Sequence, residues 1–261
     1  MTWKPGPSQI KAQAAAWRIH RHFAITEPSE IDVETIAMAR GVFVANGKTP
    51  GTDAWLVRGD GLGLVRVNDG IRERGRRRFA IAHELGHWEL HRDQSQVGML
   101  CHAVDLRDYT NSPTEIEANV FAAEFLMPTR HFQAACRGRQ PDLAIIKDLA
   151  EQYDTTLTAT AMRYVDLSPQ TCLVVFSEEG RVRYWRGRQG NSGFWIDKAQ
   201  AISQESMAWQ CWMNGVTESN PVEVPGTAWF PSSRDAEDLS VTEHSMRLGG
   251  YNMIMSLLWI M

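Results

Sequence analysis

The sequence predicts an α+β fold, with helices in the first two-thirds of the chain and strands in the last third. Apolar residues recur at helical spacing in several segments before residue 168, and β-rich runs around a Glu-Gly turn follow residue 171. Six of the ten tryptophans lie in the last third. We therefore expect three parts, residues 1–140, 141–168 and 169–261.

Composition and charge exclude several classes of protein. The chain has 261 residues, 43% hydrophobic and 22% charged, which is ordinary for a protein with a large core. A net charge of −4 argues against a protein that mainly coats nucleic acid. We expect neither a secretory signal nor a membrane span, because the N-terminus has no apolar core and YNMIMSLLWIM is too short. The four cysteines form no CxxC pair, and because no export signal is seen we expect reduced, partly buried thiols in a cytoplasmic protein.

The helices and strands are expected in a definite order. Residues 8–24 and 30–40 are typical of helices, with Ser29 as the N-cap of the second and Gly41 as its stop. Alternation broken by Gly, Pro and Asp predicts hairpin strands over 42–69. Later elements are a helix from Arg74, a helix over 114–127 ended by Pro128, two short helices around Asp154–Thr156, and a hairpin around Glu179–Gly180.

The segment RRFAIAHELGHWELHRD, residues 77–93, carries the first sign of chemistry. His83 and His87 are four residues apart, so on a helix both imidazoles reach one tetrahedral zinc ion. Glu84 would lie beside the metal, where it can take a proton from water and pass it to a leaving amine. The alternative is a core helix that is rich in histidine. Gly86 favours the metal site, since a helical glycine suits the close approach of another backbone or a ligand.

A catalytic zinc site needs a third protein ligand. His91 is the next candidate along the helix, but three successive ligands would span about 12 Å of its axis. We therefore expect His91 to support a ligand or to lie at the helix end. Glu115 is the better third ligand, because its helix face carries small residues that let two helices pack closely. The alternative for Glu115 is a capping box with Ser112.

Neighbours of Glu115 on the same helix also receive predictions. Asn119 lies one turn further on, where its amide would hold a histidine ring or the carboxylate. Glu117 lies on a different face, in line with Glu124, and we expect that face to be solvated.

Four segments of the sequence resemble the ImmA/IrrE-type zinc metallopeptidases. They are, in order, the helix quoted above, EIEANVFAAEFLMP, IIKDLAEQYDTTLTATAMRYVDLS and CLVVFSEEGRVRYWRG. The resemblance implies a thermolysin-like (gluzincin-type) minimal peptidase domain, a helix-turn-helix segment and a GAF-like domain. It implies Zn²⁺ held by His83, His87 and Glu115, with Glu84 as general base. It further implies cleavage of a helix-turn-helix repressor, which releases stress-response or mobile-element genes.

In this resemblance a strand precedes the catalytic helix, and here that strand is LGLVRVND. We expect it to pair with an extended substrate by β-augmentation. The residues concerned are Leu64, Val65, Arg66 and Val67.

Other interpretations stay open. The protein is alternatively a DNA- or protein-binding regulator with a structural metal, for which His91 or His102 would supply a fourth ligand. A peptidase acting on general peptides is a third interpretation. Manganese would also suit a His/His/Glu site. The oligomeric state is left undetermined.

Weaker signals concern DNA and the developing oxyanion. The second short helix, TLTATAMRYV, has one arginine, so direct DNA binding is not favoured. The basic run RERGRRR, residues 72–78, is equally suited to steering a substrate or to a solvated approach to the helix. Candidates for stabilising an oxyanion are Tyr109, His102 and Arg72.

Overall fold

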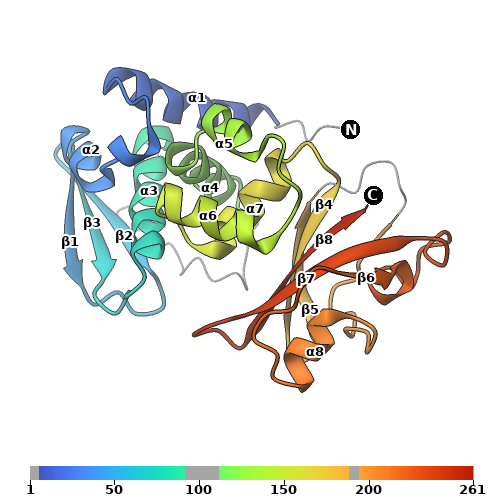
Figure 1. Ribbon diagram of the computed structural model, residues 1–261. Coiled ribbons are helices and arrows are strands. Elements are labelled where there is room, and N and C mark those ends of the chain that lie inside the picture. The colour runs from blue at the N-terminus through green and yellow to red at the C-terminus, as the bar shows by residue number, and fades with distance from the viewer. Residues whose placement is uncertain (1–5, 92–111, 188–193, 261) are drawn as a thin grey trace. The chain divides into compact units, whose positions relative to one another are not determined.

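The computed structural model describes residues 6–91, 112–187 and 194–260. The chain forms two compact units, one built from Lys4–Phe132 with Ala150–Thr156 and the other from Gln133–Leu149 with Leu157–Met261. The first contains helices and a three-stranded sheet, and the second contains a five-stranded antiparallel sheet (Figure 1). The expected α+β class is thus present, while the division at residues 140 and 168 stays a prediction.

Helices of the first unit follow the expected order. Their bounds are α1 Pro7–His22, η1 Pro28–Glu30, α2 Val33–Ala39, α3 Arg74–Leu90 and α4 Pro113–Leu126. The N-cap prediction for α2 was wrong: Ser29 lies inside η1, and the Asp32 carboxylate accepts the Thr35 amide hydrogen instead. Gly41, with φ of 82°, follows α2 as expected, in a conformation that favours glycine.

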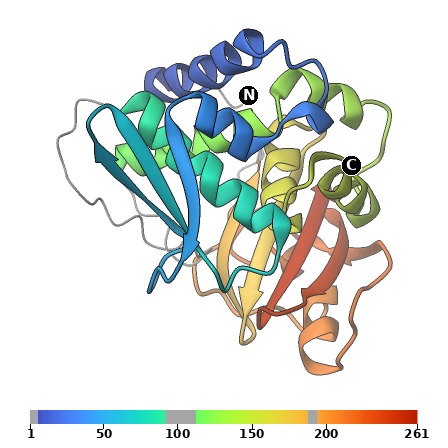
Figure 2. The same ribbon diagram turned by 90° about the vertical axis from the view of Figure 1, so that its left-hand side faces the viewer.

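The three-stranded sheet comprises β1 Val42–Gly47, β2 Ala54–Gly59 and β3 Leu62–Asn68, in the order β1-β3-β2. Asp60 and Gly61 both have positive φ, 47° and 77°, as a two-residue hairpin turn between β2 and β3 requires. Strand β1 instead pairs with β3 in parallel. Buried side chains alternate along β3, and α3 contacts all three strands (Figure 2). The sheet therefore packs against α3, the helix that carries His83 and His87.

Gly75, in the first turn of α3, lies against the backbone of Thr155. A Cβ at Gly75 would lie 2.6 Å from the Thr155 carbonyl carbon, closer than any real contact. We expect Gly75→Ala to lower the free energy of unfolding by about 1–3 kcal/mol, because overpacking outweighs the gain in helix propensity. Urea denaturation measures this. Gly59→Ala is the control, because its Cβ would meet nothing within 4 Å, and an equal loss there would contradict the account.

His20 joins α1 to α4. Its Nε2 lies 2.9 Å from the Phe125 carbonyl oxygen, and its ring stacks on the Phe125 ring. Burial lowers the pKa of His20, a shift only partly opposed by this hydrogen bond and by Glu124. The ring is therefore neutral in the folded protein at pH values where the unfolded chain already binds a proton.

A pH dependence of stability follows from His20. Above the unfolded pKa of about 6.5 the residue contributes nothing to the pH dependence. As the pH falls through that value, protonation of the unfolded chain lowers the free energy of unfolding until the folded pKa is reached. We expect His20→Gln to weaken this loss as the pH falls below about 6.5, as measured by urea titrations. His22→Gln, at an exposed position, should not weaken it, and equal effects would contradict the assignment.

The second unit is built on one antiparallel sheet in the order β5-β4-β8-β7-β6. Its elements are β4 Cys172–Glu178, β5 Arg181–Gly187, α8 Met207–Met213, β6 Val222–Pro225, η2 Gly226–Ala228, β7 Ser240–Leu248 and β8 Met253–Ile260. The turn at Glu179 and Gly180 is confirmed, and the C-terminal apolar run is strand β8. Cys136, Cys172 and Cys211 are buried and form no disulfide among the described residues, and Cys101 lies outside those residues. No helix in the described part of the chain is long and apolar enough to cross a membrane.

In sequence, three helices lie between α4 and β4. They are α5 Thr129–Cys136, α6 Leu143–Tyr153 and α7 Leu157–Leu167. The turn between α6 and α7 is where the sequence predicted it, and Asp154 in that turn has φ of 50°. Every residue of α7 is buried or half-buried, and the helix packs on β4 and β5.

Candidate metal centre

The close packing of α3 on α4 forms the frame of the site. A Cβ at Gly86 would lie 3.0 Å from Phe121 Cδ1 and 3.2 Å from both the Cα and the carbonyl oxygen of Ala118. Glycine at this position therefore lets the α4 backbone approach α3, as the sequence predicted. Small side chains on α4, Ala118 and Ala122, complete the contact and are fully buried.

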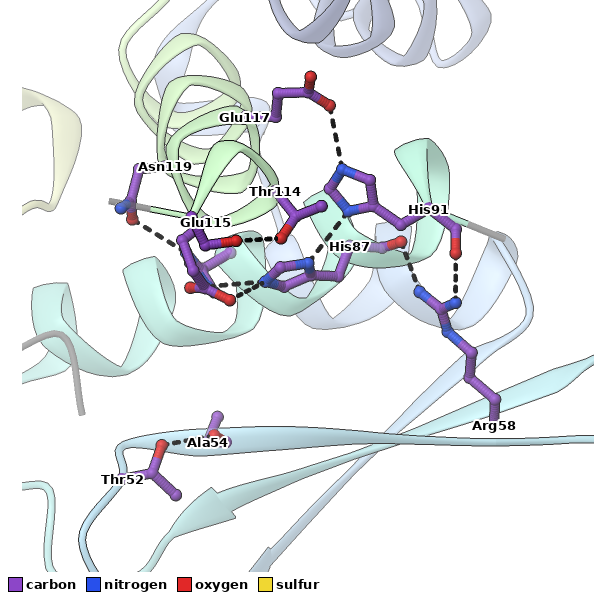
Figure 3. Close-up of polar contacts among 11 residues, drawn as sticks. Thr52, Ala54, Arg58, His87, His91, Thr114, Glu115, Glu117 and Asn119 are labelled. Carbon is purple, nitrogen blue, oxygen red and sulfur yellow. Dashed lines mark hydrogen bonds and ion pairs between the residues drawn. The ribbon is translucent and has the colours of Figure 1, made fainter. Parts of the chain in front are cut away.

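His83, His87 and Glu115 converge at this contact. Figure 3 shows His87 and Glu115 pointing toward each other there. The two Nε2 atoms lie 3.1 Å apart, and the Glu115 oxygens lie 3.1 Å from His83 Nε2 and 3.2 Å from His87 Nε2. Two atoms about 2.0–2.1 Å from one zinc ion, at the tetrahedral angle, are separated by about 3.3 Å. The observed spacing therefore fits one tetrahedral ion.

The competing interpretation of Glu115 as a helix cap is not supported. Ser112 is the N-cap residue of α4, but its side chain accepts no hydrogen bond from the α4 backbone. The Glu115 carboxylate faces the two imidazoles instead. Burial raises the pKa of Glu115, but hydrogen bonds from His83 and His87 outweigh it and hold this pKa well below its usual range. An ionised carboxylate is the form that binds a cation.

Glu84 is adjacent to the first imidazole in sequence and is 1% exposed. On α3 it is one residue from His83 and therefore points about 100° away from it around the helix axis. A buried carboxylate beside a metal site is the group that general-base catalysis needs.

The outer nitrogens of both imidazoles are hydrogen-bonded. His83 Nδ1 lies 2.9 Å from Asn119 Oδ1, so the structure places Asn119 where the sequence analysis expected it. His87 Nδ1 lies 3.1 Å from His91 Nδ1, and His91 Nε2 lies 3.0 Å from Glu117 Oε2. His91 thus contacts a ligand residue and does not itself join the three-residue cluster.

The prediction of a solvated face at Glu117 and Glu124 was wrong. The side chain of Glu117 is 15% exposed and bound to His91. Glu124 is 0% exposed and accepts hydrogen bonds from Trp17 Nε1 and from the amide and hydroxyl of Thr129. Helix periodicity alone missed both, because the partners come from α1, from α5 and from the end of α3.

Arg58 is a residue of the site region that sequence reasoning missed. It projects from β2 and donates to the carbonyl oxygens of His91 at 2.5 Å and His87 at 2.6 Å (Figure 3). These carbonyls lie at the C-terminal end of α3, where the His87 carbonyl also accepts the His91 amide hydrogen at 3.1 Å. Alternation along β2 puts Arg58 on the inner face, but only the observed strand order could identify its partner.

The expectation that β3 pairs with substrate is corrected. Residues Leu64–Val67 belong to the middle strand, whose two sides are taken by β1 and β2. Among the described strands, β1 and β2 each pair with β3 alone and so form the two edges of the sheet. Figure 3 draws Ala54, at the start of β2, below Glu115 and His87 in that view.

The basic run before α3 is largely engaged within the protein. Arg76 binds Asp53 through two bonds of 2.7 and 2.8 Å, and Arg77 binds Glu34. Arg74 and Arg78 both pair with Asp154. These contacts favour a structural role for the run. Of the oxyanion candidates, Tyr109 and His102 lie outside the described residues, and Arg72 is exposed.

Comparison with known families agrees with this geometry. The profile of peptidase M78, described as an IrrE N-terminal-like domain, matches residues 37–164, a range that includes α3 and α4. This chain carries an M78 peptidase domain. The M78 domain therefore contains a His-His-Glu cluster that is able to hold a metal ion.

A solved structure extends the comparison beyond the M78 domain. A Mycobacterium tuberculosis transcriptional regulator is similar with a TM-score of 0.63 and 14% identity, over 96% of this chain and 76% of that chain. Identity at this level shows a shared fold alone. A search of curated protein sequences gives no significant match to this chain.

Proposed function

We propose that the M78 domain is a metal-dependent, site-specific endopeptidase that cleaves a helix-turn-helix repressor in the cytoplasm. The cleavage would relieve repression of stress-response or mobile-element genes. The observation that carries this proposal is the buried His83/His87/Glu115 cluster with Glu84 next to it in sequence, within an M78 domain.

The donor set suits zinc, and manganese is the second choice. Two imidazole nitrogens and one carboxylate leave a fourth tetrahedral position for the reaction. A bound metal would supply Lewis acidity, which polarises the scissile carbonyl and brings the pKa of water close to 7. Burial lowers the pKa of His87 against the opposing effect of Glu115, and this direction favours the neutral ring that binds a cation.

Proton transfer falls to Glu84. Its carboxylate would take a proton from the attacking water and pass it to the nitrogen of the leaving amine. The same carboxylate would serve first as the base and then as the acid, so both proton transfers use Glu84 in one position. Asn119 and His91 would hold the His83 and His87 rings in place while these bind the metal.

A substrate in extended form would pair with the edge of β2 that no described strand occupies. The backbone of β2 would offer the hydrogen bonds, and β2 contacts α3, the helix that carries His83 and His87. A repressor segment must leave its own fold to bind in this way, which favours narrow specificity over general proteolysis.

The remaining parts of the chain receive coarser proposals. We assign a thermolysin-like arrangement to residues 1–140, supported by a sheet packed on the histidine helix and by the pairing of α3 with α4. Residues 141–168 would be a helix-turn-helix segment for structure or docking, supported by the burial of α7. A GAF-like domain over 169–261 is supported by the single antiparallel sheet.

A second candidate is a non-proteolytic regulator that uses its metal structurally. The name of the similar solved structure, a transcriptional regulator, favours it. The coordination of the metal separates the two, because a structural zinc takes four protein ligands and a catalytic zinc keeps an open position.

The experiment pairs the purified protein with the helix-turn-helix repressor encoded beside it, with added zinc or manganese. Gels and intact mass spectrometry follow the products, and casein is the comparison substrate. A single cut in the repressor with intact casein supports the proposal. Degradation of casein would instead support a general peptidase, and no cleavage with either ion would support the regulator.

A further inference from the structure

The hydrogen bonds beyond His87 form a chain with one direction. Within the cluster His87 directs Nε2 at Glu115 and His83, so a ligating Nε2 requires the hydrogen on Nδ1. That Nδ1–H donates to His91 Nδ1 at 3.1 Å, which makes His91 Nδ1 an acceptor. His91 must then carry its hydrogen on Nε2, and it donates this hydrogen to Glu117 Oε2 at 3.0 Å.

The hydrogen bonds that run from His87 through His91 to Glu117 are protected from water. His87 is 3% exposed, His91 is 6% exposed, and the Glu117 side chain is 15% exposed. Hydrogen bonds in such surroundings are stronger than on the surface, because water competes little and the local dielectric constant is low. The protein therefore maintains the order in which His87 donates to His91 and His91 donates to Glu117.

His91 reaches both partners because it leaves the helix. It is the C-cap of α3, with φ of −123° and ψ of 33°, so its ring turns toward α4 and does not continue along the α3 axis. Arg58 holds this end of α3 by binding the carbonyl oxygens of His87 and His91. The two metal-facing imidazoles thus differ: His83 ends on the neutral amide of Asn119, and His87 ends, through His91, on a carboxylate.

We infer that Glu117 is a positioning residue that acts through His91 to fix the tautomer and orientation of the His87 ring, and so strengthens metal binding. The inference rests on the metal site of the proposed function. It does not depend on proteolysis or on the identity of the substrate. The Glu117 carboxylate favours Nε2–H on His91, which leaves His91 Nδ1 free to accept from His87 and keeps His87 Nε2 available as a ligand.

The test measures zinc affinity by competition with a chromogenic chelator. Glu117→Leu removes the acceptor, and we expect zinc binding roughly 10- to 100-fold weaker, as for other groups that support metal ligands. Glu117→Gln keeps an acceptor oxygen and loses the charge, so its zinc affinity should fall between those of wild type and Glu117→Leu. Glu151→Gln removes one exposed carboxylate from α6 and should bind zinc like wild type.

A second readout separates this role from simple packing. Long-range ¹H–¹⁵N spectra of the zinc-loaded protein report histidine tautomers, and we expect His87 as Nδ1–H and His91 as Nε2–H in wild type. Glu117→Leu should lose the unique His91 tautomer. If Glu117→Leu fails to fold, Glu117→Gln decides by the same two measurements.

Each outcome has one meaning. Unchanged zinc affinity and unchanged tautomers in the Glu117 variants would overturn the inference and leave the metal site intact. A wild-type protein that binds no zinc would overturn both. Weaker zinc binding without any cleavage of the repressor would support the inference while the proposed function fails.

Discussion

Glu84→Gln should lower the rate of repressor cleavage by about a thousandfold, the middle of the range for loss of a general acid–base group. Glutamine has nearly the same shape as glutamate but accepts no proton from water. The three-residue cluster does not include Glu84, so zinc affinity should stay within a few-fold of wild type. Cleavage followed under single-turnover conditions, beside a zinc competition assay, measures both quantities.

The matched control for this prediction is Glu89→Gln on the same helix. Glu89 binds Arg40 through bonds of 2.9 and 3.0 Å and belongs to neither the cluster nor its supporting hydrogen bonds. The Glu89→Gln variant should cleave the repressor at a rate close to that of wild type. Cleavage by Glu84→Gln at the wild-type rate would remove Glu84 from the mechanism.

Glu115→Ala should weaken zinc binding by two orders of magnitude or more. Zinc sites of about 10–16 kcal/mol share their binding energy among four ligands, so one ligand accounts for roughly 3 kcal/mol. The variant also loses the negative charge that offsets the cation between two buried imidazoles. Cleavage should be lost together with the metal and should return only in part at high zinc concentration.

Two measurements separate this effect from a helix-capping role. Zinc should raise the Tm of wild type by mass action and should raise that of Glu115→Ala much less. Ser112→Ala should bind zinc like wild type, since Ser112 makes no capping hydrogen bond to α4. Wild-type zinc affinity in Glu115→Ala would assign the third ligand elsewhere.

Local patterns in the sequence predicted most of the candidate site. The i, i+4 spacing placed His83 and His87 on one face, and the small residues on the next helix indicated Glu115 and Asn119. Gly86 indicated a close neighbour, which is the α4 backbone at Ala118. These signals depend on helix geometry, which a few adjacent residues determine.

The errors share one physical origin, which is that partners distant in the chain decide burial and pairing. Strand β3 looked like a substrate-binding strand because no local pattern shows that β1 pairs with it in parallel, on the side opposite β2. Glu117 looked solvated because its partner, His91, lies where α3 has already ended. Arg58 could not be assigned until β2 was seen beside α3.

The most direct test is X-ray diffraction at the zinc absorption edge from crystals of the zinc-loaded protein. We expect one anomalous peak about 2.0–2.2 Å from His83 Nε2, His87 Nε2 and a Glu115 oxygen, with the fourth position taken by no protein atom. Such a peak would support the peptidase. A peak with a fourth protein ligand, or no peak at this cluster, would contradict it.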